Sequence, residues 1–172
     1  FPPQCVPDPV RWENYVRALT AMPFGRYFLN TIYVTVMSGL GSVGSSLVIS
    51  YGFARLRFPG RDQLFLLVIA TMMLPYQVTM IPSFILFRYL GWVDTFLPLF
   101  VPFFFGRPFF IFLLRQFFLS IPKELDEAAR IDGCSSLGIL VRVLLPQVKP
   151  ALAALAILSF MWAWDDFMHP LI

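Results

Sequence analysis

Four long apolar stretches divide the chain. The stretches that carry no formal charge, or only one, are 27–54, 63–87, 95–114 and 150–164. The first three reach or exceed the about 20 residues that an α-helix needs to cross a bilayer. The fourth continues into Asp165 and Asp166. The pattern predicts four membrane-spanning helices, the first from about Tyr27 to about Leu56.

The composition is that of an integral membrane protein. Hydrophobic residues make up 58% of the chain and charged residues only 13%, whereas soluble domains carry about 25% charged residues. We therefore predict an all-α membrane protein. The first apolar run is too long, and starts too far into the chain, to be a cleavable signal peptide. Because the sequence opens on Phe1 and ends at Ile172 within an apolar run, we expect a fragment of a longer protein.

Basic residues are unevenly divided between the two sides of the predicted bundle. Eight lie in the turn after the first helix and in 115–149, against four on the other side: Arg11, Arg17, Arg26 and Arg88. An excess of Lys and Arg marks cytoplasmic segments. We therefore place 115–149 in the cytoplasm and residues 1–26 on the extracytoplasmic side.

Small polar residues line one face of the first predicted helix. They recur every four residues, at Ser38, Ser42, Ser46 and Ser50, and this spacing keeps them on the same side of a helix. A stripe of small residues lets helix backbones approach closely in lipid, where apolar side chains alone give little driving force. We expect this face to pack against other helices.

Two prolines interrupt the second predicted helix. Pro75 and Pro82 are separated by a segment that contains Gln77 and Thr79. Proline frees backbone carbonyls and kinks a helix, which membrane proteins tolerate where neighbours or water satisfy those carbonyls. Two interpretations stay open: a kink that serves packing, or polar groups that face a transport pathway.

The sequence gives no sign of a metal, cofactor or catalytic site. Cys5 and Cys134 are predicted on opposite sides of the membrane, so we expect no disulfide. His169 stands alone and is interpreted as an interfacial side chain. Neither a phosphate-binding Gly-rich loop nor a catalytic constellation is present. The chain is therefore predicted to lack an ATPase site and not to be an enzyme.

A charged segment, 120–146, lies between the third and fourth apolar stretches. Ser120 and Pro122 are typical of a helix start and Gly133 of a stop, which predicts a helix of about eleven residues. Ser135 then caps a second helix that ends at Pro146. Its apolar residues recur at i, i+3, i+4 and i+7: Leu137, Leu140, Val141 and Leu144. The pattern predicts a two-helix hairpin on the cytoplasmic face.

This hairpin has two interpretations. It could be an amphipathic helix pair that lies on the lipid headgroups, or a docking element for a protein. Residues 120–133 carry four acidic and two basic side chains, which is a poor match to an anionic leaflet. A protein partner therefore fits better.

The hairpin also carries a motif. Glu127-Ala128-Ala129 is followed after three residues by Gly133, and after nine more by the run Val143-Leu144-Leu145-Pro146. This pattern resembles the coupling motif of the inner-membrane permease subunits of binding-protein-dependent ABC importers. Further segments are similar to the carbohydrate-uptake branch of that family, which includes the maltose transporter: 24–30, 53–60 and 111–116.

The resemblance implies a fold, a location and partners. The fold would be that of a type I importer permease, incomplete here, with residues 27–172 as its transmembrane domain in a prokaryotic inner membrane. The partners would be two cytoplasmic ATPase subunits, a second permease, an extracytoplasmic binding protein and a sugar, with no nucleic acid. The residues expected to contact the ATPase are Glu127, Ala128, Ala129, Asp132, Gly133, Leu145 and Pro146.

Charged residues within membrane helices are costly and call for a partner. At ~1.5 Å per residue along a helix, Arg107 and Asp165 lie at similar depths. Both depart from the residues usual in the family that the chain resembles. We expect Arg107 to pair with Asp165 or Asp166, either as a structural clamp or as polar lining of a pathway.

Other functions also stay open. The same family would accommodate another solute, such as glycerol phosphate. A secondary transporter would need an ion-coupling residue and no ATPase. A membrane scaffold would use the hairpin only to recruit a soluble partner.

Overall fold

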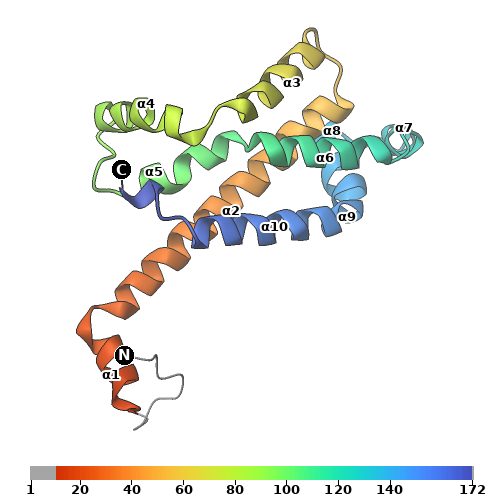
Figure 1. Ribbon diagram of the computed structural model, residues 1–172. Coiled ribbons are helices and arrows are strands. Elements are labelled where there is room, and N and C mark those ends of the chain that lie inside the picture. Colours follow the sequence, from red (N-terminus) through yellow and green to blue (C-terminus); the bar gives the residue numbers. More distant parts are fainter. Residues whose placement is uncertain (1–10, 172) are drawn as a thin grey trace, which may run out of the picture. The chain divides into compact units, whose positions relative to one another are not determined.

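The computed structural model describes residues 11–171, and within them every regular element is a helix (Figure 1). The chain divides into two units, 1–33 and 34–172. The first contains the short helix α1, Glu13–Ala21. In the second, the described helices are the remainder of α2 (Phe24–Arg55), α3 (Arg61–Ala70), η1 (Thr71–Met73), α4 (Tyr76–Tyr89), α5 (Leu97–Phe100), η2 (Val101–Phe105), α6 (Pro108–Ser120), α7 (Glu124–Ile131), α8 (Ser136–Gly138), η3 (Ile139–Leu144), α9 (Leu145–Gln147), α10 (Lys149–Trp164) and η4 (His169–Leu171).

Two described segments are long and apolar enough to cross a membrane on their own: α2, and the run Leu97–Ser120 that joins α5, η2 and α6. Two further pairs of consecutive helices are long and apolar enough to cross a membrane only when the two helices of each pair are taken together. Arg61–Met73 and Tyr76–Tyr89 are bent by 101°, and Ser136–Gln147 and Lys149–Trp164 by 81°. The four predicted helices thus correspond to two spans, or up to four if each bent pair is one span.

The second predicted helix is broken rather than kinked at its first proline. Leu74 leaves the helical region, with φ −80° and ψ 116°, and Pro75 follows at ψ 141°. Proline disfavours the helical conformation of the residue before it, so the helix ends there and α4 starts anew at Tyr76. Pro82, in contrast, lies inside α4.

The predicted serine face of α2 is buried, which confirms that this face packs against other helices. Each of its four members is at most 3% exposed: Ser38, Ser42, Ser46 and Ser50. Ser42 Oγ lies 3.0 Å from Ser159 Oγ of α10. This contact brings α10 against the middle of α2.

The same face also supports the irregular stretch around η2. Ser38 Oγ donates to Leu99 O (3.1 Å), and Ser45 Oγ shares its proton between Gly41 O of its own helix (2.6 Å) and Phe103 O (3.1 Å). Backbone that leaves the α-helical pattern at membrane depth needs partners within the protein. The serine hydroxyls supply these partners.

The hydrophobic core gathers where the Arg55 end of α2 meets α6, α10 and the segment between them. Its most buried side chains, each fully or almost fully covered, are Phe110, Leu114, Phe118, Ile139, Leu144, Val148 and Leu155. In Figure 1, α6 lies between α3 and α10, and it contacts both. The core therefore sits next to the charged hairpin and not at the opposite end of the helices.

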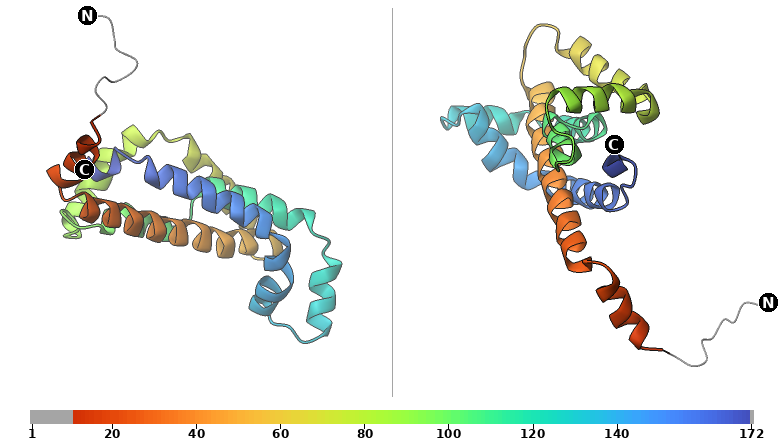
Figure 2. Two further views of the ribbon diagram at one scale, coloured as in Figure 1. Left: turned by 90° about the horizontal axis from the view of Figure 1, so that it is seen from below. Right: turned by 90° about the vertical axis from the view of Figure 1, so that its left-hand side faces the viewer.

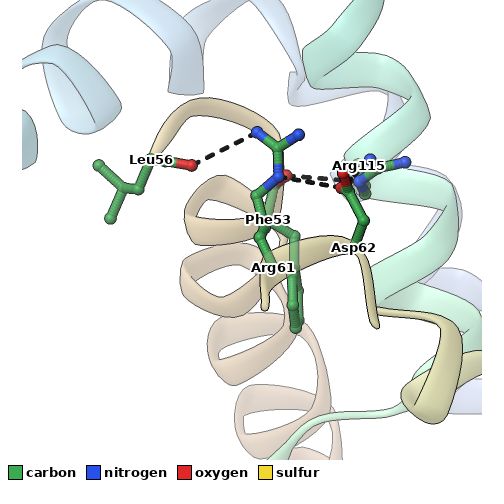
Figure 3. A network of polar contacts seen from close by, with 5 residues as sticks. All are labelled: Phe53, Leu56, Arg61, Asp62 and Arg115. Atoms are coloured by element: carbon green, nitrogen blue, oxygen red, sulfur yellow. Dashed lines mark hydrogen bonds and ion pairs between the residues drawn. The ribbon is translucent and has the colours of Figure 1, made fainter. Parts of the chain in front are cut away.

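A polar network ties the turn after α2 to α6 (Figure 3). Arg61 Nε lies 3.1 Å from Asp62 Oδ1, and Arg115 Nη2 lies 3.9 Å from the same oxygen. Arg115 Nε also donates to Phe53 O at 3.4 Å. The start of α3 is thus held beside both α2 and α6.

Candidate functional site

The predicted hairpin is present, and α7, α8, η3 and α9 together extend beyond the ends of α2, α6 and α10 (Figure 2). Its first helix is shorter than predicted. Ser120 is still the last residue of α6, and its hydroxyl donates to Phe117 O rather than capping a new helix. The chain then turns through the extended residue Ile121 before Pro122, so α7 spans only Glu124–Ile131.

The predicted stop at Gly133 is confirmed. Gly133 has φ +81°, a left-handed conformation that glycine adopts without steric cost. The N–H of Gly133 donates to Arg130 O, and the N–H of Cys134 donates to Ala129 O. This pair of hydrogen bonds is the Schellman motif, which satisfies the last carbonyls of a helix. Gly133 therefore sets the turn between the two arms.

The second arm begins as predicted but winds differently. Ser135 Oγ accepts the N–H of Gly138 at 3.2 Å, which confirms the predicted cap. From Ile139 to Leu144 the chain is a π-helix, and Leu145 N–H donates to Leu140 O, five residues earlier. Because this wider winding changes the helical period, the predicted apolar stripe is wrong in part.

The buried face of the second arm shows the consequence of this winding. Leu140 and Leu144 are buried, whereas Leu137 and Val141 are exposed. Pro146 does not itself end the arm, because helical winding continues through α9 to Gln147. The bend comes instead at Val148, between α9 and α10.

The two faces of α7 differ in character. Asp126 and Ala129 are both 7% exposed and face the chain's own core. The exposed residues of the predicted contact set are Glu127, Ala128, Asp132, Gly133 and Pro146, and Leu145 is half-buried. Ala129, which was also expected to contact the ATPase, packs its methyl group inward.

The outward face of the hairpin also carries large apolar side chains. Ile131 is 86% exposed and Leu137 is 67% exposed. Glu124 and Glu127 lie in the first turn of α7, where negative charge stabilises the positive end of the helix dipole. The exposed charges of the hairpin are of both signs, because Lys123, Arg130 and Arg142 are exposed as well as Glu124, Glu127 and Asp132.

Sequence reasoning did not find a buried ion pair on the inward face. Arg55 Nε of α2 lies 3.1 Å from Asp126 Oδ2 of α7, and the two side chains are 2% and 10% exposed. Arg55 Nη2 also donates to Ile121 O at 2.9 Å. The signal available in the sequence was an acidic residue directly before the Glu-Ala-Ala motif and an arginine at the end of the first helix.

Within the membrane segments, Arg107 does not form the ion pair that was expected. Its guanidinium carbon lies 4.4 Å from the centroid of Phe103 and 4.8 Å from that of Trp162. These ring faces attract a cation. The ion pairs formed by the described residues include none of Arg107 with Asp165 or Asp166.

Asp166 has another partner, which explains the difference. His169 Nδ1 lies 2.8 Å from Asp166 Oδ2, and the His169 N–H donates to Asp166 Oδ1 at 3.2 Å. The centroid of the His169 ring lies 4.4 Å from that of Tyr76, with the two ring planes tilted by 40°. Asp166 therefore closes the end of α10 and is not free to turn toward Arg107.

The polar residues of α4 contribute little to a shared site. Gln77 is exposed, and the Thr79 hydroxyl donates to Tyr76 O within its own helix. A cavity of about 500 Å³ lies nearby, and its lining includes Tyr76, Trp92, Asp94, Phe103 and His169. Neither Gln77 nor Thr79 lines this cavity.

Comparison with known proteins identifies the family of the chain. Residues 42–172 match the family described as the binding-protein-dependent transport system inner membrane component. The chain belongs to this family. The matched region contains the second half of α2, the whole hairpin and every described membrane segment after α2.

Relatives with assigned names are transport permeases. The chain is 35% identical over 160 residues to the osmoprotective compounds uptake permease of Synechocystis, covering 92% of this chain and 54% of that protein. It is 35% identical over 167 residues to the arabinooligosaccharides transport permease of Halalkalibacterium halodurans, covering 96% and 60%. It is 32% identical over 177 residues to the sn-glycerol-3-phosphate transport permease of Yersinia pestis, covering 99% and 63%.

A solved structure has the same fold. The crystal structure of a bacterial ABC transporter involved in the import of the acidic polysaccharide alginate matches with a TM-score of 0.75 and 34% identity, over 88% of this chain and 53% of that one. The chain is thus an all-α membrane protein with the fold of an ABC importer permease. It spans about half the length of the relatives that it matches.

Proposed function

We propose that the complete protein is a permease subunit of an ATP-driven importer, with a carbohydrate as its cargo. It forms half of a translocation pathway and takes its energy from an ATPase subunit through the 120–146 hairpin. The observation that carries the proposal is the outward face of α7, where Glu127 and Ala128 are exposed beside the Gly133 turn. Membership of the permease family supports the same function.

The proposal includes the other subunits of the transporter. Two ATPase subunits dock on the predicted cytoplasmic side, a second permease completes the pathway, and an extracytoplasmic binding protein delivers the sugar. The subunit itself hydrolyses no ATP. Its location is the inner membrane of a prokaryote, with the hairpin in the cytoplasm because basic residues are concentrated on that side.

Reconstitution of the complete protein tests this function. The subunit is placed in liposomes with the second permease, the ATPase and the binding protein encoded beside it, and uptake of a panel of labelled sugars is measured with ATP supplied on the ATPase side. We expect uptake that requires ATP and is inhibited by vanadate. Uptake driven by an ion gradient and insensitive to vanadate would instead identify a secondary transporter.

An anionic cargo is the second candidate, and Arg107 is the observation that favours it. This residue holds a positive charge among aromatic rings in a membrane segment, and one relative is named as a permease for sn-glycerol-3-phosphate. In this alternative, Arg107 contributes to the pathway, together with Gln77, Thr79, Asp165 or Asp166. Uptake of labelled glycerol 3-phosphate, measured beside uptake of the labelled sugar panel in the same liposomes, distinguishes the two cargoes.

A further inference from the structure

The Arg55 end of α2 is fastened to both arms of the hairpin. Arg55 Nη2 donates to Ile121 O (2.9 Å), and Arg55 Nε pairs with Asp126 Oδ2 (3.1 Å) on the first arm. Tyr51, one turn earlier, donates its hydroxyl to Ser136 O on the second arm at 2.9 Å. These three contacts, which we name the hairpin anchor, join elements that are far apart in the sequence.

The hairpin anchor is not optimised for stability. Arg55 Nε, Arg55 Nη1 and Asp126 Oδ1 are all buried without a hydrogen-bond partner among the described residues, so the 3.1 Å ion pair is a charge contact and not an aligned hydrogen bond. A buried ion pair must repay the loss of hydration of both charges, so an apolar pair of similar volume is often equally stable. What the pair adds is an electrostatic attraction between α2 and α7, two elements that are far apart in the sequence.

We propose that Arg55 is a positioning residue that makes the hairpin and the end of α2 move as one body. The proposal rests on the proposed function, in which an ATPase subunit displaces the hairpin. Asp126 directly precedes Glu127, so the same helical turn holds the anchor on one face and the docking surface on the other. A displacement of the docking surface therefore reaches α2 directly and not only through the chain connections to α6 and α10.

Movement of α2 would be transmitted to the segment around η2, where the membrane domain is not α-helical. Ser38 and Ser45 of α2 hold the carbonyls of Leu99 and Phe103, and Ser46 accepts the backbone N–H of Arg107 at 3.0 Å. A shift along α2 therefore displaces the break between η2 and α6. The anchor would thus connect the docking surface to the segment that holds Arg107.

The first test measures whether the two elements move together. Spin labels replace the exposed residues Arg57 and Lys123 in the complete protein, assembled with its partner subunits on a background without other cysteines. We expect one narrow distance distribution, unchanged when nucleotide binds. A distance that changes on nucleotide binding would show that the hairpin moves relative to α2, and this result would overturn the proposal.

Variants then assign this behaviour to the ion pair. Arg55→Met with Asp126→Leu replaces both charges with apolar groups and leaves no unpaired charge, so the protein should still fold. We expect this double variant to give a broad distance distribution. The control, Arg61→Met, removes an ion pair of the same 3.1 Å length that does not contact the hairpin, and leaves Asp62 beside Arg115. The control should keep the narrow distribution, and an equally narrow distribution in the Arg55 double variant would overturn the proposal.

The same variants give a functional readout. We expect the Arg55 double variant to retain the ATPase subunit and to hydrolyse ATP, with at least a tenfold fall in solute imported per ATP, whereas the control keeps the wild-type ratio. An unchanged ratio in the Arg55 double variant would contradict the proposal. If the wild-type protein bound no ATPase subunit, the proposed function would fail, but the nucleotide-free distance measurement would still decide whether Arg55 holds the hairpin.

Discussion

At the scale of single residues, Gly133 controls the hairpin through its backbone. A Cβ at this position would meet no atom within 4 Å, so space does not limit substitution, but φ is +81°. A residue held in this left-handed region costs about 1–3 kcal/mol, and the cost is greatest for β-branched side chains. We expect Gly133→Val to distort the turn and to lower both ATPase binding and uptake in the reconstituted transporter.

Gly133→Asn is the matched control for this prediction. Asparagine enters the left-handed region far more readily than valine, and both substitutions add a side chain of moderate size in open space. We expect Gly133→Asn to retain most of the wild-type ATPase binding and uptake. Equal loss in both variants would mean that the added side chain, and not the backbone conformation, disturbs the docking surface.

Arg107 offers a second prediction at this scale. Its guanidinium lies over the rings of Phe103 and Trp162, and lysine keeps the charge but loses the planar surface that stacks on a ring. We expect Arg107→Lys to lower the free energy of unfolding by about 0.5–2 kcal/mol, measured by thermal unfolding of the complete protein in detergent. Arg88→Lys, at an exposed position of α4, should leave the unfolding temperature unchanged.

Residues with a local role could be predicted from the sequence, and residues with distant partners could not. Gly133 and Ser135 act on backbone groups a few residues away, and both predictions are confirmed. Asp126 resembles an ordinary acidic residue in the first turn of a helix, where negative charge is favourable in any case. Its buried partner comes from α2, and no short-range pattern indicates that pairing.

At the scale of elements, the buried serine face of α2 could be predicted from the sequence because the spacing of its serines matches the helix period. Ser38 and Ser50 are equally buried, but Ser38 donates to Leu99 O of another segment, whereas Ser50 donates to Leu47 O of its own helix. Polar contacts between membrane helices contribute on average about 0.6 kcal/mol and at most about 1.7. We expect Ser38→Ala to destabilise the protein by an amount in this range.

Ser50→Ala is the control for this helix contact. It removes a hydroxyl of the same size and burial without breaking a bond between segments, so the unfolding temperature in detergent should stay close to the wild-type value. A loss as large as that of Ser38→Ala would show that burial of the hydroxyl matters and the contact to Leu99 does not.

The elements that differed from expectation are those where the helical period changes. The apolar stripe of the second arm was predicted with the α-helical period, but Ile139–Leu144 is a π-helix, and Leu137 and Val141 are consequently exposed. Such a segment is stabilised by contacts of Ile139 and Leu144 with the core. A local sequence pattern does not contain these contacts.

At the scale of the whole molecule, the ion pair between Arg55 and Asp126 constrains the membrane topology of 34–172. The pair requires the end of α2 and the start of α7 to lie on the same side of the membrane. An even number of crossings must therefore separate them. Leu97–Ser120 is long and apolar enough for one crossing, so we predict that the strongly bent pair of α3–η1 and α4 provides the second, as one broken span and not as a re-entrant loop.

Cysteine accessibility in the complete protein tests this topology. Single cysteines at Arg57, Asp94 and Lys123, all exposed positions in turns or at helix ends, are treated with a membrane-impermeant maleimide in right-side-out and inside-out vesicles. We expect Arg57→Cys and Lys123→Cys to react only in inside-out vesicles, because the excess of basic residues places them in the cytoplasm, and Asp94→Cys only in right-side-out vesicles. Reaction of Asp94→Cys from the same side as Arg57→Cys would make α3–α4 re-entrant. Lys123 would then lie across the membrane from Arg57, and the ion pair between Arg55 and Asp126 could not form.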